Sequence, residues 1–283
     1  MSTKEQRLYD AVLAAPDDDG PRHAYAEYIR PYDAARAELI TLQLARSATQ
    51  RTTRYRDGLP TTRERRLLQD DSEQWSRTLL RYARRVEYHR GFVGSISIDP
   101  FLFLEYGEWL FANAPLCDVR FVMAESVPFP MADLINSPLL ERLTGVSITH
   151  CLDDGSVIRL AGSPYLKNCM WLDLSHNILS FAAFDAIARS PSLRQLLFLV
   201  RDTTGDRLSH YFPGQRLVAT DRLNRWDGVI TEWGPVSPEG QQLERELGYI
   251  PWLHRDNFCK PYDARWFVEH GVLPVKPVGS PVE

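Results

Sequence analysis

The chain has 283 residues, of which 44% are hydrophobic and 25% charged, and its formal net charge is −4. This apolar content can bury a sizeable core, which excludes an intrinsically disordered chain. No apolar run approaches the roughly 18 residues of a membrane span, and the polar N-terminus lacks the apolar core of a secretory signal. We therefore expect a soluble, cytoplasmic protein.

Three short helices are predicted over 8–45, separated by the breaker segments "PDDDGP" and "RPYD". The apolar stripe of the first helix is Leu8, Ala11 and Val12, and that of the second is Ala24, Tyr25, Tyr28 and Ile29. Pro21 suits the first turn of the second helix. The acidic run Asp17–Asp19 lacks the spacing of a calcium loop, so we expect it to cap that helix.

Basic residues gather between Arg46 and Arg90, where arginines outnumber acidic residues two to one. Such a segment suits an acidic partner, and Tyr55, Trp75, Tyr82 and Tyr88 are interspersed in it. The same composition fits the solvated face of one or two helices. We favour the second interpretation, and nucleic acid is a disfavoured partner.

A strand is predicted in "RGFVGSISI", where Phe92, Gly94, Ile96 and Ile98 alternate as on a half-buried sheet. After it the chain repeats. Two apolar residues one position apart precede a small turn residue in "FVMAES", "VSITHC", "WLDLSHN" and "FLVRDT". The turn positions are Ser126, Cys151, Asn177 and Thr203, which are 25 to 26 residues apart. In the last unit this frame makes Phe198 and Val200 the buried pair.

A second landmark recurs in phase with the first. Ser-Pro stands at 137, 163 and 190, and each is followed by a leucine at the same offset. Apolar residues at i, i+3 and i+4 precede each Ser-Pro and predict a short helix, which ends there because proline disfavours helical backbone in the residue before it. Stacked units would line their strands into a parallel sheet with the helices as a second layer.

These features resemble leucine-rich repeats of the ribonuclease-inhibitor type over about 115–205. The segments "AAPDDDGPRHAYAEYI" and "RAELITLQ", with the later "RGF" strand, resemble the bacterial repeat-companion domain that occurs beside such repeats. Ala26-Glu27-Tyr28 stands where that family usually has Ala-Asp-Trp. The resemblance implies an α/β fold, namely a short leucine-rich repeat solenoid of parallel strands backed by helices, with a helical N-terminal domain and a mixed α+β C-terminal cap. The expected boundaries are 1–90, 91–205 and 206–283, with the strand at 91–98 as the N-terminal cover of the repeats.

The repeat rhythm stops after Thr203. Asp227-Gly228 predicts a hairpin, and two helices follow, the first from near Pro238 to Gly248 and the second ending at Gly271. The tryptophans of this region form either a compact core or a binding surface, and the core is favoured. They are Trp226, Trp233, Trp252 and Trp266.

Metal and cofactor sites are not predicted. The four cysteines (Cys117, Cys151, Cys169 and Cys259) are scattered without a C-x-x-C pair. His254, Cys259 and His270 match no ligand spacing, and structural roles are expected for them. The chain also lacks a phosphate loop, a G-x-S-x-G and an H-E-x-x-H motif, so we expect no catalytic residues.

Binding to another protein is the predicted function. Side chains that alternate with the buried frame should form an exposed, concave face of the sheet. The positions expected on this face are Arg120, Val122, Ser147, Thr149, Asp173, Ser175, Leu197, Leu199 and Arg201. Their mixed character suits a partner protein, and the C-terminal aromatic region is an equal alternative site.

The expected molecule is thus a non-enzymatic scaffold for protein–protein interaction. Three alternatives stay open at this point. The first is an immunity-type neutraliser of a toxin or effector, and the second is nucleic-acid binding through the segment from Arg46 to Arg90. The third is a hydrolase whose residues the sequence does not reveal as a set.

Overall fold

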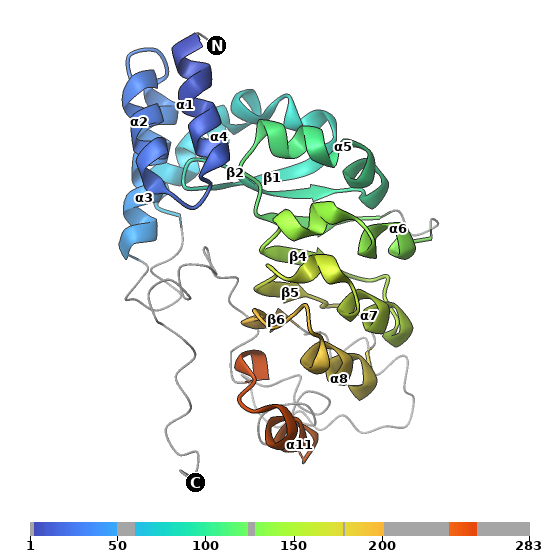
Figure 1. Ribbon diagram of the computed structural model, residues 1–283. Helices are drawn as coiled ribbons and strands as arrows, with labels where there is room; N and C mark the ends of the chain where they lie inside the picture. The colour runs from blue at the N-terminus through green and yellow to red at the C-terminus, as the bar shows by residue number, and fades with distance from the viewer. Residues whose placement is uncertain (1–2, 50–59, 124–127, 178, 201–237, 254–283) are drawn as a thin grey trace. The chain divides into compact units, whose positions relative to one another are not determined.

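The computed structural model of the chain describes residues 3–49, 60–123, 128–177, 179–200 and 238–253 (Figure 1). They form an α/β fold with N-terminal helices and a six-stranded, mostly parallel sheet whose strands follow one another in chain order. The chain divides into two compact units, 1–123 and 124–283. None of the described helices is long and apolar enough to span a bilayer.

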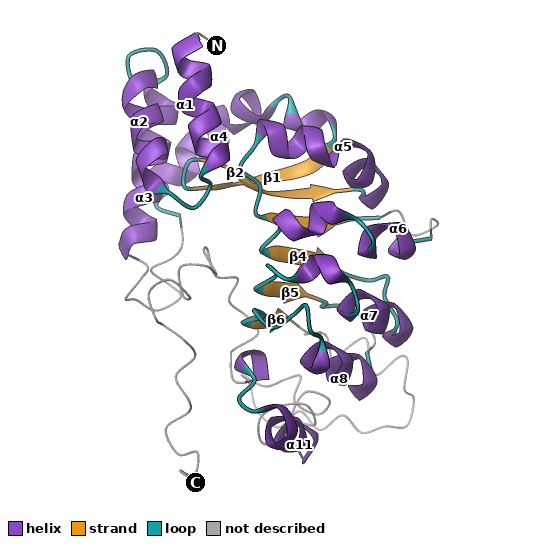
Figure 2. Cartoon of the chain, in the orientation of Figure 1, coloured by secondary structure: helices purple, strands orange, loops and turns teal. Residues whose placement is uncertain are grey.

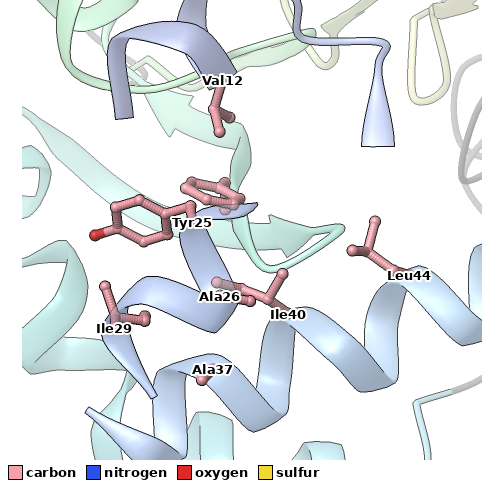
Figure 3. Close-up of a cluster of buried hydrophobic side chains, with 8 residues drawn as sticks. Val12, Tyr25, Ala26, Ile29, Ala37, Ile40 and Leu44 are labelled. Carbon is pink, nitrogen blue, oxygen red and sulfur yellow. The ribbon is translucent and has the colours of Figure 1, made fainter. Parts of the chain in front are cut away.

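The first unit opens with the three predicted helices and continues with a fourth. Their bounds are α1 (Thr3–Ala14), α2 (Asp19–Ile29), α3 (Ala34–Thr49) and α4 (Thr62–Ser76), and the 3-10 turn η3 (Leu79–Arg81) follows. Figure 3 shows the buried cluster of α1, α2 and α3, with Val12, Tyr25, Ile29 and Ile40 among its members. Phe92 of β2 belongs to the same cluster. Apolar burial of this kind is the main stabilising contribution to the packing of short helices.

The stripe predicted for α2 is wrong at one position. Ala24 is exposed, and Arg22 and Ala26 take the inward positions beside Tyr25. Arg22 is tolerated inside because its guanidinium lies 5.0 Å from the ring centroid of Phe92 and donates to backbone carbonyls. A long side chain whose terminal nitrogens are hydrogen-bonded can cover apolar surface, which a purely apolar pattern does not anticipate.

The acidic run before α2 caps the helix, as predicted. The Asp18 side chain accepts a hydrogen bond from the Gly20 backbone N–H at 2.8 Å. Arg90, from the far end of the unit's sequence, donates to the Asp17 carbonyl at 2.9 Å and to Asp19 Oδ1 at 3.1 Å. The run therefore anchors the start of α2 to the sheet.

Three strands and one helix complete the first unit. β1 (Ala83–His89) pairs antiparallel with β2 (Phe92–Ile98), and β2 pairs parallel with β3 (Asp118–Phe121). The helix α5 (Pro100–Asn113) connects β2 to β3, with Asp99 as its N-cap. β1 lies in the part of the chain for which the sequence predicted helices alone, and α5 was not predicted.

The second unit contains the repeating segments. In chain order they are α6 (Met131–Ile135), η4 (Pro138–Arg142), β4 (Gly145–Ile148), α7 (Asp154–Ala161), η5 (Pro164–Leu166), β5 (Trp171–Asp173), α8 (Phe181–Arg189) and β6 (Phe198–Val200). Figure 2 shows β4, β5 and β6 in one layer and α6, α7 and α8 in another. Each helix ends before its Ser-Pro, as predicted. The leucines after Ser-Pro (Leu140, Leu166 and Leu193) are buried.

The strand frame of the last unit differs from the prediction by one residue. Val146 pairs with Leu172, and Leu172 pairs with Leu199, so Leu199 continues the buried row and Phe198 does not. The cause is the uninterrupted apolar run "LLFLV", because alternation cannot set a register where both faces are apolar.

Within the second unit, neighbouring repeats are joined by hydrogen bonds between residues about one repeat length apart. Asn177 Oδ1 accepts from the backbone N–H groups of Cys151 (3.0 Å) and Leu152 (2.8 Å). Its Nδ2 donates to the carbonyls of Ile148 (2.7 Å) and Leu174 (2.9 Å). This one amide therefore satisfies backbone groups in two successive repeats.

The serines of the Ser-Pro steps do the same on the helix side. Ser163 Oγ donates to the Ile135 carbonyl, and Ser190 Oγ donates to the Ala161 carbonyl, both at 2.5 Å. Each hydroxyl thus donates to a carbonyl at the end of the helix of the preceding repeat, where carbonyls lack helical partners.

The described C-terminal residues form a helix and a turn. α11 (Pro238–Leu247) ends as predicted at Gly248, which has φ +82°, and η7 (Pro251–Leu253) follows and contacts β6. Trp252 is buried, in agreement with the core interpretation of this tryptophan. The predicted hairpin at 227–228, the helix ending at 271, and Trp226, Trp233 and Trp266 lie outside the described residues.

Candidate functional site

The predicted concave face is not open in the second unit. Ser147, Asp173, Ser175, Leu197 and Leu199 were expected to be exposed, and all are buried, with exposed fractions of 1–8%. Among the described residues of the predicted face in this unit, half-buried Thr149 alone reaches the surface. In the first unit Arg120 is exposed and Val122 is half-buried. Arg201 and the turn residues Ser126 and Thr203 lie outside the described residues.

Large apolar side chains close this face. Met170, Trp171, Leu197 and Phe198 form a buried cluster with Val200 packed against it. Strands of parallel sheets are commonly covered on both sides, and their sequences then read as continuous apolar runs. The expectation of an exposed face is therefore corrected to that of a sheet buried on both sides.

The polar residues under this cover are joined to one another. Asp173 Oδ2 accepts from Ser147 Oγ at 3.0 Å, and Asp173 Oδ1 accepts from Ser175 Oγ at 2.6 Å and from the Ser175 N–H at 3.0 Å. A buried carboxylate is tolerated when such donors surround it. These three side chains therefore bond to one another inside the sheet and are not exposed there.

The turns after β4 and β5 are accessible at the end of these strands. His150 is exposed and His176 is half-buried, and their rings stack with centroids 4.5 Å apart and planes 1° apart. Both residues have left-handed backbone, with φ of 68° and 62°. A residue other than glycine adopts this backbone conformation at some energetic cost. Here the hydrogen bonds of Asn177 stabilise both turns. The two turns thus present matching side chains in a fixed geometry.

Cys151 stands next to His150 in the same turn. The residue is exposed, yet partial burial of its thiol raises its pKa to about 11. The thiol is therefore protonated at neutral pH and is a poor nucleophile.

Only part of the basic segment is occupied by ion pairs within the first unit. Arg46 and Glu64 form a buried ion pair with N–O distances of 2.8–3.1 Å, and Arg63 pairs with Glu38 on the surface. The expected aromatic platform is also internal, because Trp75 packs edge-on against buried Tyr88 and donates from Nε1 to Asp33. The arginines with exposed side chains are Arg63, Arg65, Arg66, Arg77, Arg81, Arg84 and Arg85. Tyr55 lies outside the described residues.

Within the described part of the chain, one group of three residues has the donors for a metal ion. His89, Cys117 and Asp118 of the first unit each offer one ligand atom, and these atoms lie within 4.8 Å of one another. The sequence pointed to none of them, because the first is 28 residues from the next. A short distance between a histidine at the end of one strand and a Cys-Asp pair at the start of another appears only in the folded sheet. The histidines and cysteine that were weighed as ligands (His254, Cys259 and His270) lie outside the described residues.

No protein-family model, curated protein or solved structure matches this chain. The resemblance to leucine-rich repeats and to the repeat-companion domain therefore depends on the residues of this chain alone.

Proposed function

We propose that this chain is a non-enzymatic, leucine-rich-repeat scaffold of the cytoplasm that binds a protein partner through the turns after β4 and β5. The observation that carries the proposal is the stacked pair His150 and His176, which occupies equivalent positions of successive units. Repeat scaffolds offer partners surfaces built from such equivalent positions. Because the turns are already fixed, little conformational entropy would be lost when a partner binds.

The chemistry of this surface favours a protein over a nucleic acid. Imidazole rings present an apolar body with polar tips, which is a common character of protein interfaces. The chain is acidic overall, and Arg46, Arg63 and Arg90 are paired with carboxylates of the first unit. A nucleic-acid site would instead require several cations directed at phosphates.

Affinity capture tests the proposal. The tagged full chain is compared with His150→Glu and with Arg159→Glu, an exposed position of α7, in a lysate of the source cells at two salt concentrations. We expect one protein to be retained by the wild type and by Arg159→Glu at both salt concentrations, and to be lost with His150→Glu. Near-ultraviolet circular dichroism checks that both variants keep the native packing.

Two results would overturn the proposal. Recovery of nucleic acid alone, and at low salt alone, would move the function to the exposed arginines. Equal retention of the same protein by the wild type and His150→Glu would remove the turns from the binding surface.

A further inference from the structure

A feature of the first unit goes beyond the proposed binding function. We infer that His89, Cys117 and Asp118 form a binding site for a zinc ion, with three protein ligands and one position for water or an exogenous ligand. The three residues come from neighbouring parts of the sheet. His89 ends β1, Asp118 begins β3, and Cys117 directly precedes it.

A glycine between these strands lets the histidine reach the cysteine. The register passes from the pair Glu87–Ser95 to Tyr88–Val93, so Gly94 of β2 is an extra, bulged residue. A Cβ atom at Gly94 would lie 2.8–2.9 Å from the His89 side chain, Nδ1 included. The His89 ring therefore occupies the space that any other residue at 94 would fill. Bulges often redirect side chains next to functional sites.

The distances agree with the bond lengths of zinc. His89 Nδ1 and Cys117 Sγ are 3.8 Å apart. Zinc bonds of about 2.3 Å to sulfur and about 2.0 Å to nitrogen, at a tetrahedral angle, separate the two ligand atoms by about 3.6 Å. The three ligand atoms all lie within 4.8 Å of one another, so Asp118 is near enough to serve as the third ligand.

Cys117 is held in place by its contacts with the Gly94 carbonyl of β2. Its backbone N–H donates to the Gly94 carbonyl at 2.9 Å, and its Sγ approaches the same carbonyl at 3.3 Å. Metal binding would replace the thiol's contact with that carbonyl and leave the backbone hydrogen bond unchanged. The position of Cys117 is therefore set by β-sheet bonding and does not depend on an ion.

The donor types and burial favour zinc among the common metals. A thiolate with an imidazole and a carboxylate suits zinc, whereas calcium and magnesium prefer oxygen ligands alone. Asp118 is buried, and His89 and Cys117 are half-buried, so the group is partly shielded but reachable. Three protein ligands with an open fourth position are the pattern of zinc sites that bind water or a substrate.

Cobalt substitution is the first test, since cobalt(II) reports thiolate ligation by its absorption. The full chain is freed of metal with a chelator and titrated with Co²⁺, and then with Zn²⁺ in competition. We expect one equivalent of Co²⁺ to give a thiolate charge-transfer band that Zn²⁺ removes. Cys117→Ser should abolish the band, and the matched variants Cys151→Ser and Cys259→Ser should keep it.

The competition also gives affinities. Mutation of a residue that only hydrogen-bonds a metal ligand typically lowers metal affinity by roughly 10-fold or more. His89→Gln and Asp118→Asn change proposed ligands themselves and should weaken zinc binding by more than roughly 10-fold. A band that persists in Cys117→Ser, or disappears in Cys259→Ser, would overturn the assignment.

Thiol protection tests the wild-type chain directly and does not depend on the folding of a variant. The protein is treated with N-ethylmaleimide with and without Zn²⁺, and the modified cysteines are identified by peptide mass spectrometry. Zinc should slow modification of Cys117 and leave that of Cys151 unchanged. Equal modification of Cys117 in both samples would show that His89 and Cys117 form a thiol–imidazole contact without a metal, and the inference would fail.

Discussion

The two compact units differ in the side-chain contacts that stabilise each of them. In the first, side chains from distant positions meet once, as Arg46 meets Glu64 and Arg22 meets Phe92. In the second, the same kind of contact recurs between residues 25 to 29 positions apart, through Asn177, Ser163 and Ser190. A non-repeating set of contacts can form an individual site, whereas a repeating set presents equivalent positions side by side. The proposed metal site accordingly lies in the first unit and the proposed partner-binding surface in the second.

The largest effect is expected at the buried ion pair of the first unit. Glu64→Ala leaves the Arg46 guanidinium buried without its carboxylate and removes the half of the α4 capping box in which the Glu64 carboxylate accepts from the Thr61 backbone N–H. Loss of one partner from a buried pair typically costs about 3–5 kcal/mol. Urea unfolding followed by circular dichroism measures the free energy of unfolding.

A surface pair of the same residue types is the control for that change. Glu38→Ala breaks the exposed pair with Arg63 and should lower the stability far less, because exposed ion pairs are screened by water and salt. Equal losses in Glu64→Ala and Glu38→Ala would contradict the distinction between buried and surface pairs in this unit.

In the second unit the largest loss is expected for Asn177→Ala. The substitution leaves backbone groups of two neighbouring repeats without their hydrogen-bond partner. The buried Leu152 N–H is one of these groups. A buried unsatisfied group costs about 1–3 kcal/mol, so we expect a loss of roughly 2–4 kcal/mol. Asn168→Ala, which removes a single hydrogen bond to the Glu141 carbonyl, is the comparison and should cost less. A smaller loss for Asn177→Ala than for Asn168→Ala would count against a structural role of the turn amide.

The equivalence of the repeating contacts is tested by two smaller changes. Ser163→Ala and Ser190→Ala each remove a hydroxyl that bonds a helix-end carbonyl of the preceding unit. Each should cost about 1 kcal/mol, and the two values should be similar because the two hydroxyls have the same role. If one variant were neutral and the other lost several kcal/mol, the units would not be energetically equivalent.

The smallest effect concerns reactivity and leaves the stability unchanged. With a pKa of about 11, the Cys151 thiol holds a thiolate fraction at neutral pH that is at least roughly 100-fold below that of an ordinary cysteine. Iodoacetamide should therefore modify Cys151 much more slowly in the folded chain than in urea. The rate in the folded chain should rise with pH throughout the range from 7 to 9. Equal rates in the folded and unfolded chains would show that the turn does not shield the thiol.

The sequence predicted the parts of the fold that have a clear period or a clear break. The helices α1 to α3 have apolar stripes between breaker segments, and the repeats have Ser-Pro and the turn residue in phase. The helix α5 was missed because "PFLFLEYGEWLFAN" is apolar around most of its surface and so shows little period. The strand β1 was missed because its sequence, "ARRVEYH", places two arginines at adjacent exposed positions.

The candidate sites were less predictable than the fold. Alternation along β5 correctly places Leu172 and Asp173 on opposite faces of the sheet. It cannot show that Trp171 and Phe198 cover the face on which Asp173 lies. That cover depends on contacts between residues of different units. The group of His89, Cys117 and Asp118 likewise depends on the order of strands in the sheet and on the bulge at 94, and neither feature can be derived from the spacing in the chain.

Site-specific photo-cross-linking tests the proposed binding surface most directly. A photo-reactive amino acid is placed at His150 in one sample and at Arg159 of α7 in another, and both are irradiated in a lysate of the source cells. The proposed function predicts a covalent adduct with one protein from position 150 and none from position 159. Adducts of equal yield from both positions, or none from position 150 while the chain still captures its partner, would contradict it.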